Sequence, residues 1–128
     1  MKIKGADFVV YLVSDLKKAA AFYRDVLELP QTEYKKDWDW AEFDCGNITL
    51  TLFSGAVLPE IVLGGRIALG VDDIHAAHEE LKEKGVDVVK PPYELSGCWM
   101  LEILDPDRNM VFIHKRKDES VGQEQVTD

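Results

Sequence analysis

The chain reads Val13-Ser14-Asp15-Leu16 near its start and Val71-Asp72-Asp73-Ile74 past its middle. In each stretch, alternating apolar residues give way to a polar pair and then to apolar residues at helical spacing. This pattern is typical of a strand that runs into a helix with a polar N-cap. When the two stretches are aligned, Ala19 falls on Ala77. The sequence therefore contains one supersecondary unit twice.

The same signals predict the remaining elements of each half. The first half is predicted to hold a strand over 6–13, a helix over 16–27 capped by Ser14 or Asp15, and strands over 32–35, 38–45 and 48–53. The second is predicted to hold a strand over 66–71, a helix from residue 74 that Gly85 ends, and strands over 86–89, 98–104 and 110–114. Each half is therefore β-α-β-β-β.

A sheet with one helix on one face leaves its other face uncovered, and two such sheets side by side can curl that face into a shared cavity. The predicted fold class is α+β: paired βαβββ modules that form a curved mixed sheet, with helices outside and a cavity inside. We expect one domain over 1–116, with modules of about 1–54 and 65–116 and a Gly- and Pro-containing linker over 55–64. Residues 117–128 are polar and lack periodicity, so we expect a flexible tail.

Composition excludes several partners. The 128 residues hold 15 Lys and Arg against 24 Asp and Glu, a net charge of −9. Nucleic acids and anionic membranes attract the opposite sign, so neither is expected as a partner. Cys45 and Cys98 lie far apart, which predicts free thiols in a reducing compartment. The N-terminal apolar run is too short for a signal sequence or a membrane span, and we expect a cytoplasmic protein.

The chain resembles the glyoxalase/bleomycin-resistance/dioxygenase superfamily, also called the vicinal-oxygen-chelate fold. The resemblance is carried by the two capping stretches, by the helix residues 21–27, by Lys84-Gly85-Val86 and by the turn Leu104 to Asn109. It implies paired βαβββ modules, often in homodimers. It also implies a cavity that holds a divalent metal or, in the antibiotic-resistance branches, a drug without a metal. We therefore expect a homodimer with a small-molecule ligand.

The four metal-ligand positions of the family can be compared residue by residue. They fall on Phe8, Thr49, Arg66 and Phe112, where metal-binding members usually carry His or Glu. None of these side chains is a His or a carboxylate, and the permanent positive charge of Arg66 repels a divalent ion. The sequence thus predicts no metal and no other cofactor.

Period-two alternation gives the residues that face the cavity. The intervening residues are aliphatic and suit packing under the helices. Aromatic walls, one cation and several polar anchors suit a planar or amphipathic molecule with an anionic group. The candidate ligand-binding residues are Phe8, Trp40, Thr49, Thr51, Arg66, Glu102, Phe112 and His114.

The predicted function is therefore metal-free binding of a small organic ligand, anionic or aromatic. One alternative is a metal-dependent lyase, isomerase or dioxygenase whose ligands have moved to some of His114, Glu102 and Glu42. His114 and Glu102 are the candidate catalytic residues, His114 as a general base unless it is merely solvated. Another alternative is a filled cavity that an ion pair of Arg66 with Glu102 or Glu42 closes.

Three further expectations concern single positions. His75 and His78 lie three residues apart on the second helix and are expected at its surface rather than at a metal. The two cysteines are expected as buried thiols without an activating neighbour. Arg108 stands where the family usually has Gly, so we expect the turn to shift by one residue or the strain to pass to Asn109, which tolerates a positive φ better.

Overall fold

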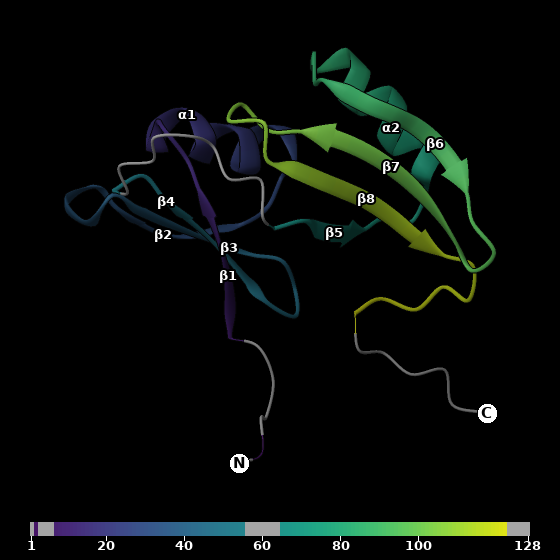
Figure 1. Ribbon diagram of the computed structural model, residues 1–128, viewed down its shortest axis with the longest axis horizontal. Coiled ribbons are helices and arrows are strands. Elements are labelled where there is room, and N and C mark those ends of the chain that lie inside the picture. The colour runs from purple at the N-terminus through teal and green to yellow at the C-terminus, as the bar shows by residue number, and fades with distance from the viewer. Residues whose placement is uncertain (1, 3–6, 56–64, 123–128) are drawn as a thin grey trace. The chain divides into compact units, whose positions relative to one another are not determined.

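Each half of the chain folds as strand, helix, strand, strand, strand, as predicted (Figure 1). The computed structural model describes residues 2, 7–55 and 65–122. It divides into two compact units, Met1–Val62 and Leu63–Asp128, and each holds one four-stranded mixed sheet. The α+β class and the two βαβββ modules are confirmed. Most of the predicted linker lies outside the described residues, and the cavity that two such sheets would share stays a prediction.

The sheet of the first unit has the strand order β1-β4-β3-β2. β1 pairs with β4 in parallel, which places Phe8 opposite Thr49, and the other pairs are antiparallel. The π-turn Phe22–Val26 continues the helix, and the 3-10 turn Lys36–Trp38 joins the second and third strands. The elements are β1 (Phe8–Leu12), α1 (Leu16–Ala21), β2 (Gln31–Lys35), β3 (Trp40–Asp44) and β4 (Thr49–Phe53).

The sheet of the second unit has the corresponding order, β5-β8-β7-β6. β5 pairs with β8 in parallel, and β8 with β7 and β7 with β6 are antiparallel. Figure 1 shows α2 lying along one side of this sheet, and the helix contacts β6, β7 and β8. The elements are β5 (Ile67–Gly70), α2 (Ile74–Glu83), β6 (Val88–Glu94), β7 (Cys98–Leu104) and β8 (Met110–Arg116).

Both helices begin at the acidic residue of the repeated stretch. The carboxylate of Asp15 accepts a hydrogen bond of 3.0 Å from the Lys18 amide, so Asp15 rather than Ser14 caps α1. Asp73 accepts from the amides of His75 and Ala76, both at 3.0 Å. These bonds satisfy amides that lack a partner within the helix.

Gly85 ends α2 as predicted. Its φ is +72°, and its amide and that of Val86 donate to the carbonyls of Lys82 and Leu81. This pair of bonds is a Schellman motif, which needs a left-handed residue that Gly adopts without a Cβ clash.

The strands differ from the predicted ranges mainly in β6, which continues to Glu94 rather than ending at residue 89. Pro91 and Pro92 lie inside it, although proline cannot donate to a strand ladder. They are tolerated because β6 is the edge of its sheet, where one row of amides has no neighbouring strand. The first strand is shorter than predicted, and Trp38 lies on the 3-10 turn instead of in β3.

The core of each unit lies between the sheet and its helix. In the first unit Leu50 and Leu52 are fully buried, and α1 contacts β3 and β4. In the second unit Val111 is fully buried and Ile113 nearly so. These are the aliphatic residues that alternation assigned to the helix side. Tyr23 and Phe22, which follow α1, are also buried.

The turn before β8 is built around Asp105. Its carboxylate accepts from the amides of Asp107 and Asn109 and from the side-chain amide of Asn109, at 2.7–2.9 Å. Arg108 itself has a φ of +68°. The expectation that the turn would shift or that Asn109 would take the left-handed conformation is therefore wrong. Asn109 is held by Asp105, and the positive φ stays at the position where the family usually has Gly.

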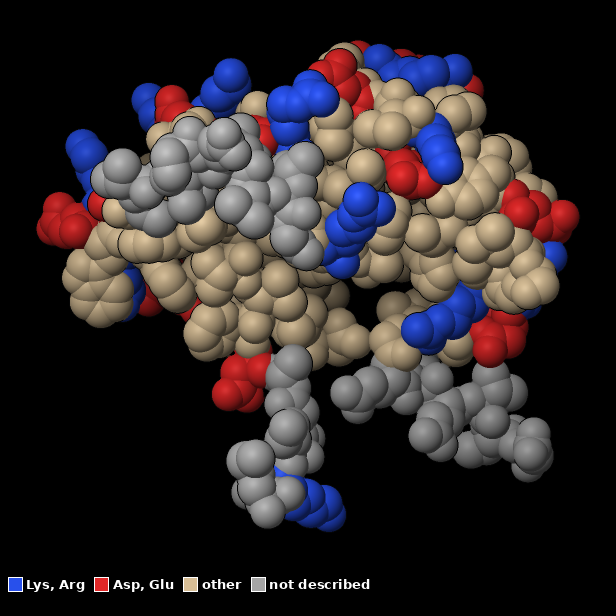
Figure 2. Space-filling view, in the orientation of Figure 1, with Lys and Arg blue, Asp and Glu red and all other residues tan. Residues whose placement is uncertain are grey.

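Charged side chains of both signs are interspersed on the visible face of each unit (Figure 2). Several form exposed ion pairs, such as Lys82 with Glu79 at 2.8 Å. Pairs of this kind stabilise a protein by less than about 1 kcal/mol each. Within the described residues, no helix is long and apolar enough to cross a membrane.

Candidate functional site

Each sheet has one face turned away from its helix, and we call this its helix-free face. In the first unit, the helix-free face exposes large apolar side chains: Phe8 is 52% exposed and Val10 38%. The Phe8 and Trp40 rings meet edge to face at 6.3 Å between centroids, and Trp40 meets Phe53 at 6.0 Å. The predicted cavity residues Phe8 and Trp40 therefore form one aromatic cluster with Phe53. Such rings enclose flat apolar molecules well.

Thr51 lies in the middle of the same face. Its neighbours across the sheet are Val10 on β1 and Glu42 on β3, in the row between those of Phe8 and Trp40. The residue is fully buried, and its hydroxyl has no hydrogen-bond partner among the described residues. An unpaired buried hydroxyl costs about 1–3 kcal/mol, so a ligand atom that formed a hydrogen bond with Thr51 would remove this cost.

Phe112 occupies the middle of the helix-free face of the second unit. It lies opposite Ala68 on β5 and Glu102 on β7. The guanidinium of Arg66, an exposed residue just before β5, stands over the Phe112 ring, with 5.8 Å from Cζ to the ring centroid. Cations bind aromatic faces in this way, and the donors of Arg66 stay open to an anionic group.

Glu102 is a buried charged residue on this face, with its side chain 9% exposed. Its Oε2 accepts a hydrogen bond of 2.6 Å from the Tyr93 hydroxyl, and Lys90 Nζ stands 3.8 Å from the same oxygen. In the described part of the chain Arg66 makes no ion pair with Glu102. The Arg66–Glu102 alternative is therefore not what this structure forms.

His114 lies two residues beyond Phe112 on the same face and is half-buried. Burial lowers the pKa of His114 below its ordinary value, and the positive charge of Arg116 lowers it further. The imidazole is consequently neutral near pH 7, the form that can accept a proton. No carboxylate is placed to orient it in the contacts of the described residues.

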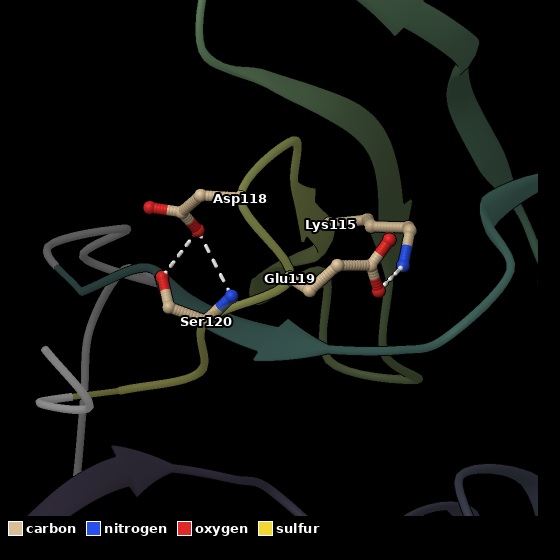
Figure 3. A network of polar contacts seen from close by, with 4 residues as sticks. All are labelled: Lys115, Asp118, Glu119 and Ser120. Carbon is tan, nitrogen blue, oxygen red and sulfur yellow. Dashed lines mark hydrogen bonds and ion pairs between the residues drawn. The ribbon is translucent and has the colours of Figure 1, made fainter. Parts of the chain in front are cut away.

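The segment after β8 reaches this face as well. Arg116 donates from Nη1 to the Gly122 carbonyl at 2.8 Å. Lys115 pairs with Glu119, and Asp118 accepts from the amide and hydroxyl of Ser120 (Figure 3). A Cβ built on Gly70 would meet Val121 Cγ1 at 3.3 Å. Residues 117–122 thus make specific contacts, and Val121 lies over Gly70, the strand neighbour of His114. Residues 123–128 of the expected flexible tail lie outside the described residues.

The other single-residue expectations concern the two histidines of α2 and the two cysteines. His75 is exposed on α2, and its ring meets that of Trp99 edge to face at 5.7 Å. His78 is half-buried on the same helix. Both cysteines are free and half-buried, and burial and Asp44 raise the pKa of the Cys45 thiol. A raised pKa disfavours the reactive thiolate of Cys45.

Tyr93 and Lys90 are site residues that the sequence analysis missed. Both act on Glu102 although they lie three positions apart, which would put them on opposite faces of a regular strand. The pairing of β6 with β7 is irregular between Lys90 and Tyr93, and this β-bulge lets both side chains reach one carboxylate. A sequence signal existed in Pro91-Pro92, because prolines favour edge strands and bulges.

The residues at the family's metal positions do not fit a divalent ion. Phe8 and Phe112 offer hydrocarbon rings, and Arg66 offers only donors with a positive charge. Thr49, opposite Phe8, has one weak oxygen. Elsewhere in the described ranges, no group of three or more His, Cys, Asp or Glu side chains is placed to hold a metal. The relocated set of His114, Glu102 and Glu42 draws on residues of both units and stays an alternative hypothesis.

Comparison with known proteins agrees with this fold. The model of the Glyoxalase/Bleomycin resistance protein/Dioxygenase superfamily matches residues 5–113. The chain is 31% identical over 119 residues to the uncharacterized protein YraH of Bacillus subtilis (strain 168), covering 81% of this chain and 92% of that protein. It is 31% identical over 127 residues to a probable lactoylglutathione lyase of Vibrio parahaemolyticus, covering 88% of this chain and 91% of that one.

Solved structures share the fold at lower identity. TnmS3, an antibiotic binding protein from Streptomyces sp. CB03234, superimposes with a TM-score of 0.78 at 23% identity and covers 91% of this chain and 99% of its own. Two βαβββ modules with these strand orders define a vicinal-oxygen-chelate fold. The chain belongs to the Glyoxalase/Bleomycin resistance protein/Dioxygenase superfamily.

Proposed function

We propose that this protein binds a small organic ligand, aromatic and anionic, on the helix-free faces of its sheets without a metal ion. One observation carries the proposal: Phe8, Thr49, Arg66 and Phe112 stand at the four positions where the resemblance to the family implies His or Glu ligands. Aromatic rings and a guanidinium are poor metal ligands but good partners for a flat anion. The structural relative named as an antibiotic binding protein supports this class of function.

In this proposal, each residue of the site contacts a different part of the ligand. In the first unit, Phe8 and Trp40 enclose the apolar part of a ligand, and Thr51 supplies a hydrogen bond. In the second unit, Phe112 stacks on the ligand, and Arg66 binds its anionic group. Thr49, Glu102 and His114 line the same faces as polar anchors. The proposal also has the protein act in the cytoplasm as a homodimer.

An NMR titration of the isotope-labelled full chain with 4-methylbenzoate tests the binding. We expect shifts of the amide signals around Phe112, and we expect Arg66→Ala to weaken the affinity about tenfold or more, since a charge-assisted hydrogen bond is lost. Arg24→Ala is the matched control, because Arg24 is an exposed arginine that pairs with Asp25 on the helix side of the first unit. Equal affinities of both variants would remove Arg66 from the site.

The enzyme alternative is favoured by the relative named as a probable lactoylglutathione lyase. Metal content after incubation with Zn²⁺, Ni²⁺, Mn²⁺ or Fe²⁺ and dialysis decides between the two. We expect no stoichiometric retention. Retention of one metal per chain, lost in Glu102→Gln or His114→Gln, would move the protein to the metal-dependent lyases, isomerases or dioxygenases.

A further inference from the structure

The Glu102 carboxylate has an unused acceptor on the ligand face of the second unit. Both of its contacts, the Tyr93 hydroxyl at 2.6 Å and the long ion pair with Lys90 at 3.8 Å, go to Oε2. Its Oε1 has no hydrogen-bond partner among the residues that the structure describes. The side chain is 9% exposed, and Oε1 itself keeps some contact with solvent. Oε1 therefore lacks a protein donor and is open to a donor on a bound ligand.

Lys90 does not supply that donor. Its side chain is 63% exposed, and its ammonium stands 5.6 Å from the centroid of the Tyr93 ring, at the rim of the sheet. An ion pair of this length and exposure contributes less than about 1 kcal/mol. The Tyr93 hydroxyl has a single proton, which it donates to Oε2. The missing donor must therefore come from outside these two side chains.

Glu102 and Arg66 lie on opposite sides of Phe112, and their positions determine where a ligand would need its acidic and its donor group. In the strand order β5-β8-β7, Phe112 lies on the strand between Ala68, which follows Arg66 closely, and Glu102. Two strand spacings separate the backbones on either side, roughly 10 Å. The Phe112 ring thus has a cation over it on one flank and an acidic side chain with a free oxygen on the other.

We propose that the ligand of this face is dipolar: an aromatic molecule with an acidic group that binds Arg66 and an ammonium or N–H donor that binds Oε1 of Glu102. This deepens the proposed function and rests on it, since it adds the second polar group that the ligand carries. The donor binds Oε1 of Glu102, which has no hydrogen-bond partner among the described residues, and Phe112 stacks against the ring between the two groups.

Three probes of the same shape test the proposal on the full chain. They are 4-(aminomethyl)benzoate, with both charges at opposite ends of one ring, 4-methylbenzoate, with the anion alone, and 4-methylbenzylamine, with the cation alone. Dissociation constants come from NMR titrations up to about 10 mM, the weak limit of such binding. We expect 4-(aminomethyl)benzoate to bind about tenfold more tightly than either single-charge probe.

Two variants separate the acidic contact from the general effect of charge. Glu102→Gln keeps the shape of the side chain and an acceptor for Tyr93, and it is expected to abolish the tenfold preference for 4-(aminomethyl)benzoate over 4-methylbenzoate. Glu94→Gln is the matched control on β6, where Glu94 pairs with Lys117 at 2.9 Å, and it is expected to keep the preference. Carboxyl ¹³C shifts of Glu102 provide a second readout, which moves only when a donor reaches the oxygen.

The outcomes separate this inference from the function on which it rests. If 4-methylbenzoate binds through Arg66 but the amino group adds nothing, or Glu102→Gln leaves the preference intact, the dipolar ligand is wrong and the proposed function stands. If no probe shifts signals near Phe112, both are contradicted. A preference that both Glu102→Gln and Glu94→Gln reduce equally would reflect net charge and would also overturn the inference.

Discussion

The Tyr93 hydroxyl donates a hydrogen bond of 2.6 Å to Glu102 and joins the edge strand β6 to β7. This hydrogen bond, together with burial and the carboxylate charge, raises the pKa of Tyr93 to about 12. The ordinary value for tyrosine is about 10, so the pair favours the neutral phenol in the folded state. Its contribution to stability is complete below about pH 10 and is lost as the pH rises toward 12.

We therefore predict that Tyr93 ionises near pH 12 in the folded protein. Absorbance of tyrosinate during a base titration measures this. Glu102→Gln removes the charge that holds the proton and should lower the pKa of Tyr93, whereas Tyr34→Phe, at a more exposed tyrosine, should leave the late ionisation in place. A Tyr93→Phe variant whose tyrosinate titration curve matches that of the wild type near pH 12 would contradict the assignment.

His114 should titrate below the usual histidine range, because burial and then Arg116 lower its pKa. A lowered folded-state pKa means that its contribution to stability is complete above about pH 6.5 and is lost as the pH falls. In an NMR pH titration, Arg116→Gln should raise the pKa of His114, and Arg116→Lys should keep it low. If the two variants behave alike, the charge of Arg116 is not what acts on the imidazole.

The left-handed backbone of Arg108 should be relieved by glycine. Its φ of +68° brings a Cβ close to the carbonyl that follows, a cost that Gly avoids. We predict that Arg108→Gly raises the free energy of unfolding by about 0.5–1 kcal/mol in urea denaturation, after the extra entropy of the unfolded glycine is counted. Arg108→Ala keeps the Cβ and should change little. A gain in the Ala variant equal to that in Gly would trace the cost to the arginine side chain instead.

Within the same turn, replacing Asp105 should lower the free energy of unfolding more than replacing any other residue. Its carboxylate accepts three hydrogen bonds, and the residue is 4% exposed. Asp105→Ala should lower the free energy of unfolding by about 2–4 kcal/mol, because the buried amides lose a charged acceptor. Asp105→Asn retains an acceptor for the two backbone amides and should cost less. Equal losses in the two variants would argue against these hydrogen bonds as the cause.

The sequence was sufficient for the repeat, the order of elements along each βαβββ unit and the assignment of faces. Period-two alternation has only two solutions, and aliphatic residues such as Leu50 and Val111 select one of them. That is why Phe8, Trp40, Phe112 and His114 could be placed on helix-free faces. N-caps of both helices could also be predicted, with Ser14 as the alternative to Asp15, because an N-cap is a local interaction.

The Tyr93–Glu102 pair could not be predicted because a bulge between two strands decides it. A bulge changes which side chains share a face, and its position depends on the partner strand rather than on local sequence. The same holds for Val121, whose place over Gly70 follows from turns after β8 that involve Arg116. The sequence also suggested that Asn109 rather than Arg108 would take a positive φ, because asparagine tolerates it better. The hydrogen bonds of Asp105 to Asn109 instead hold Asn109 in place and leave the positive φ at Arg108.

Because Val121 contacts Gly70, the segment after β8 competes with any ligand that would occupy the same position. A side chain attached a few residues beyond β8 is present at its contact point at an effective concentration in the millimolar range, whatever the protein concentration. Any ligand that extends from Phe112 past His114 toward Gly70 must displace it. A short ligand at Phe112 therefore does not compete with Val121. The measured affinity of a long ligand, in contrast, includes the cost of displacing Val121 from Gly70.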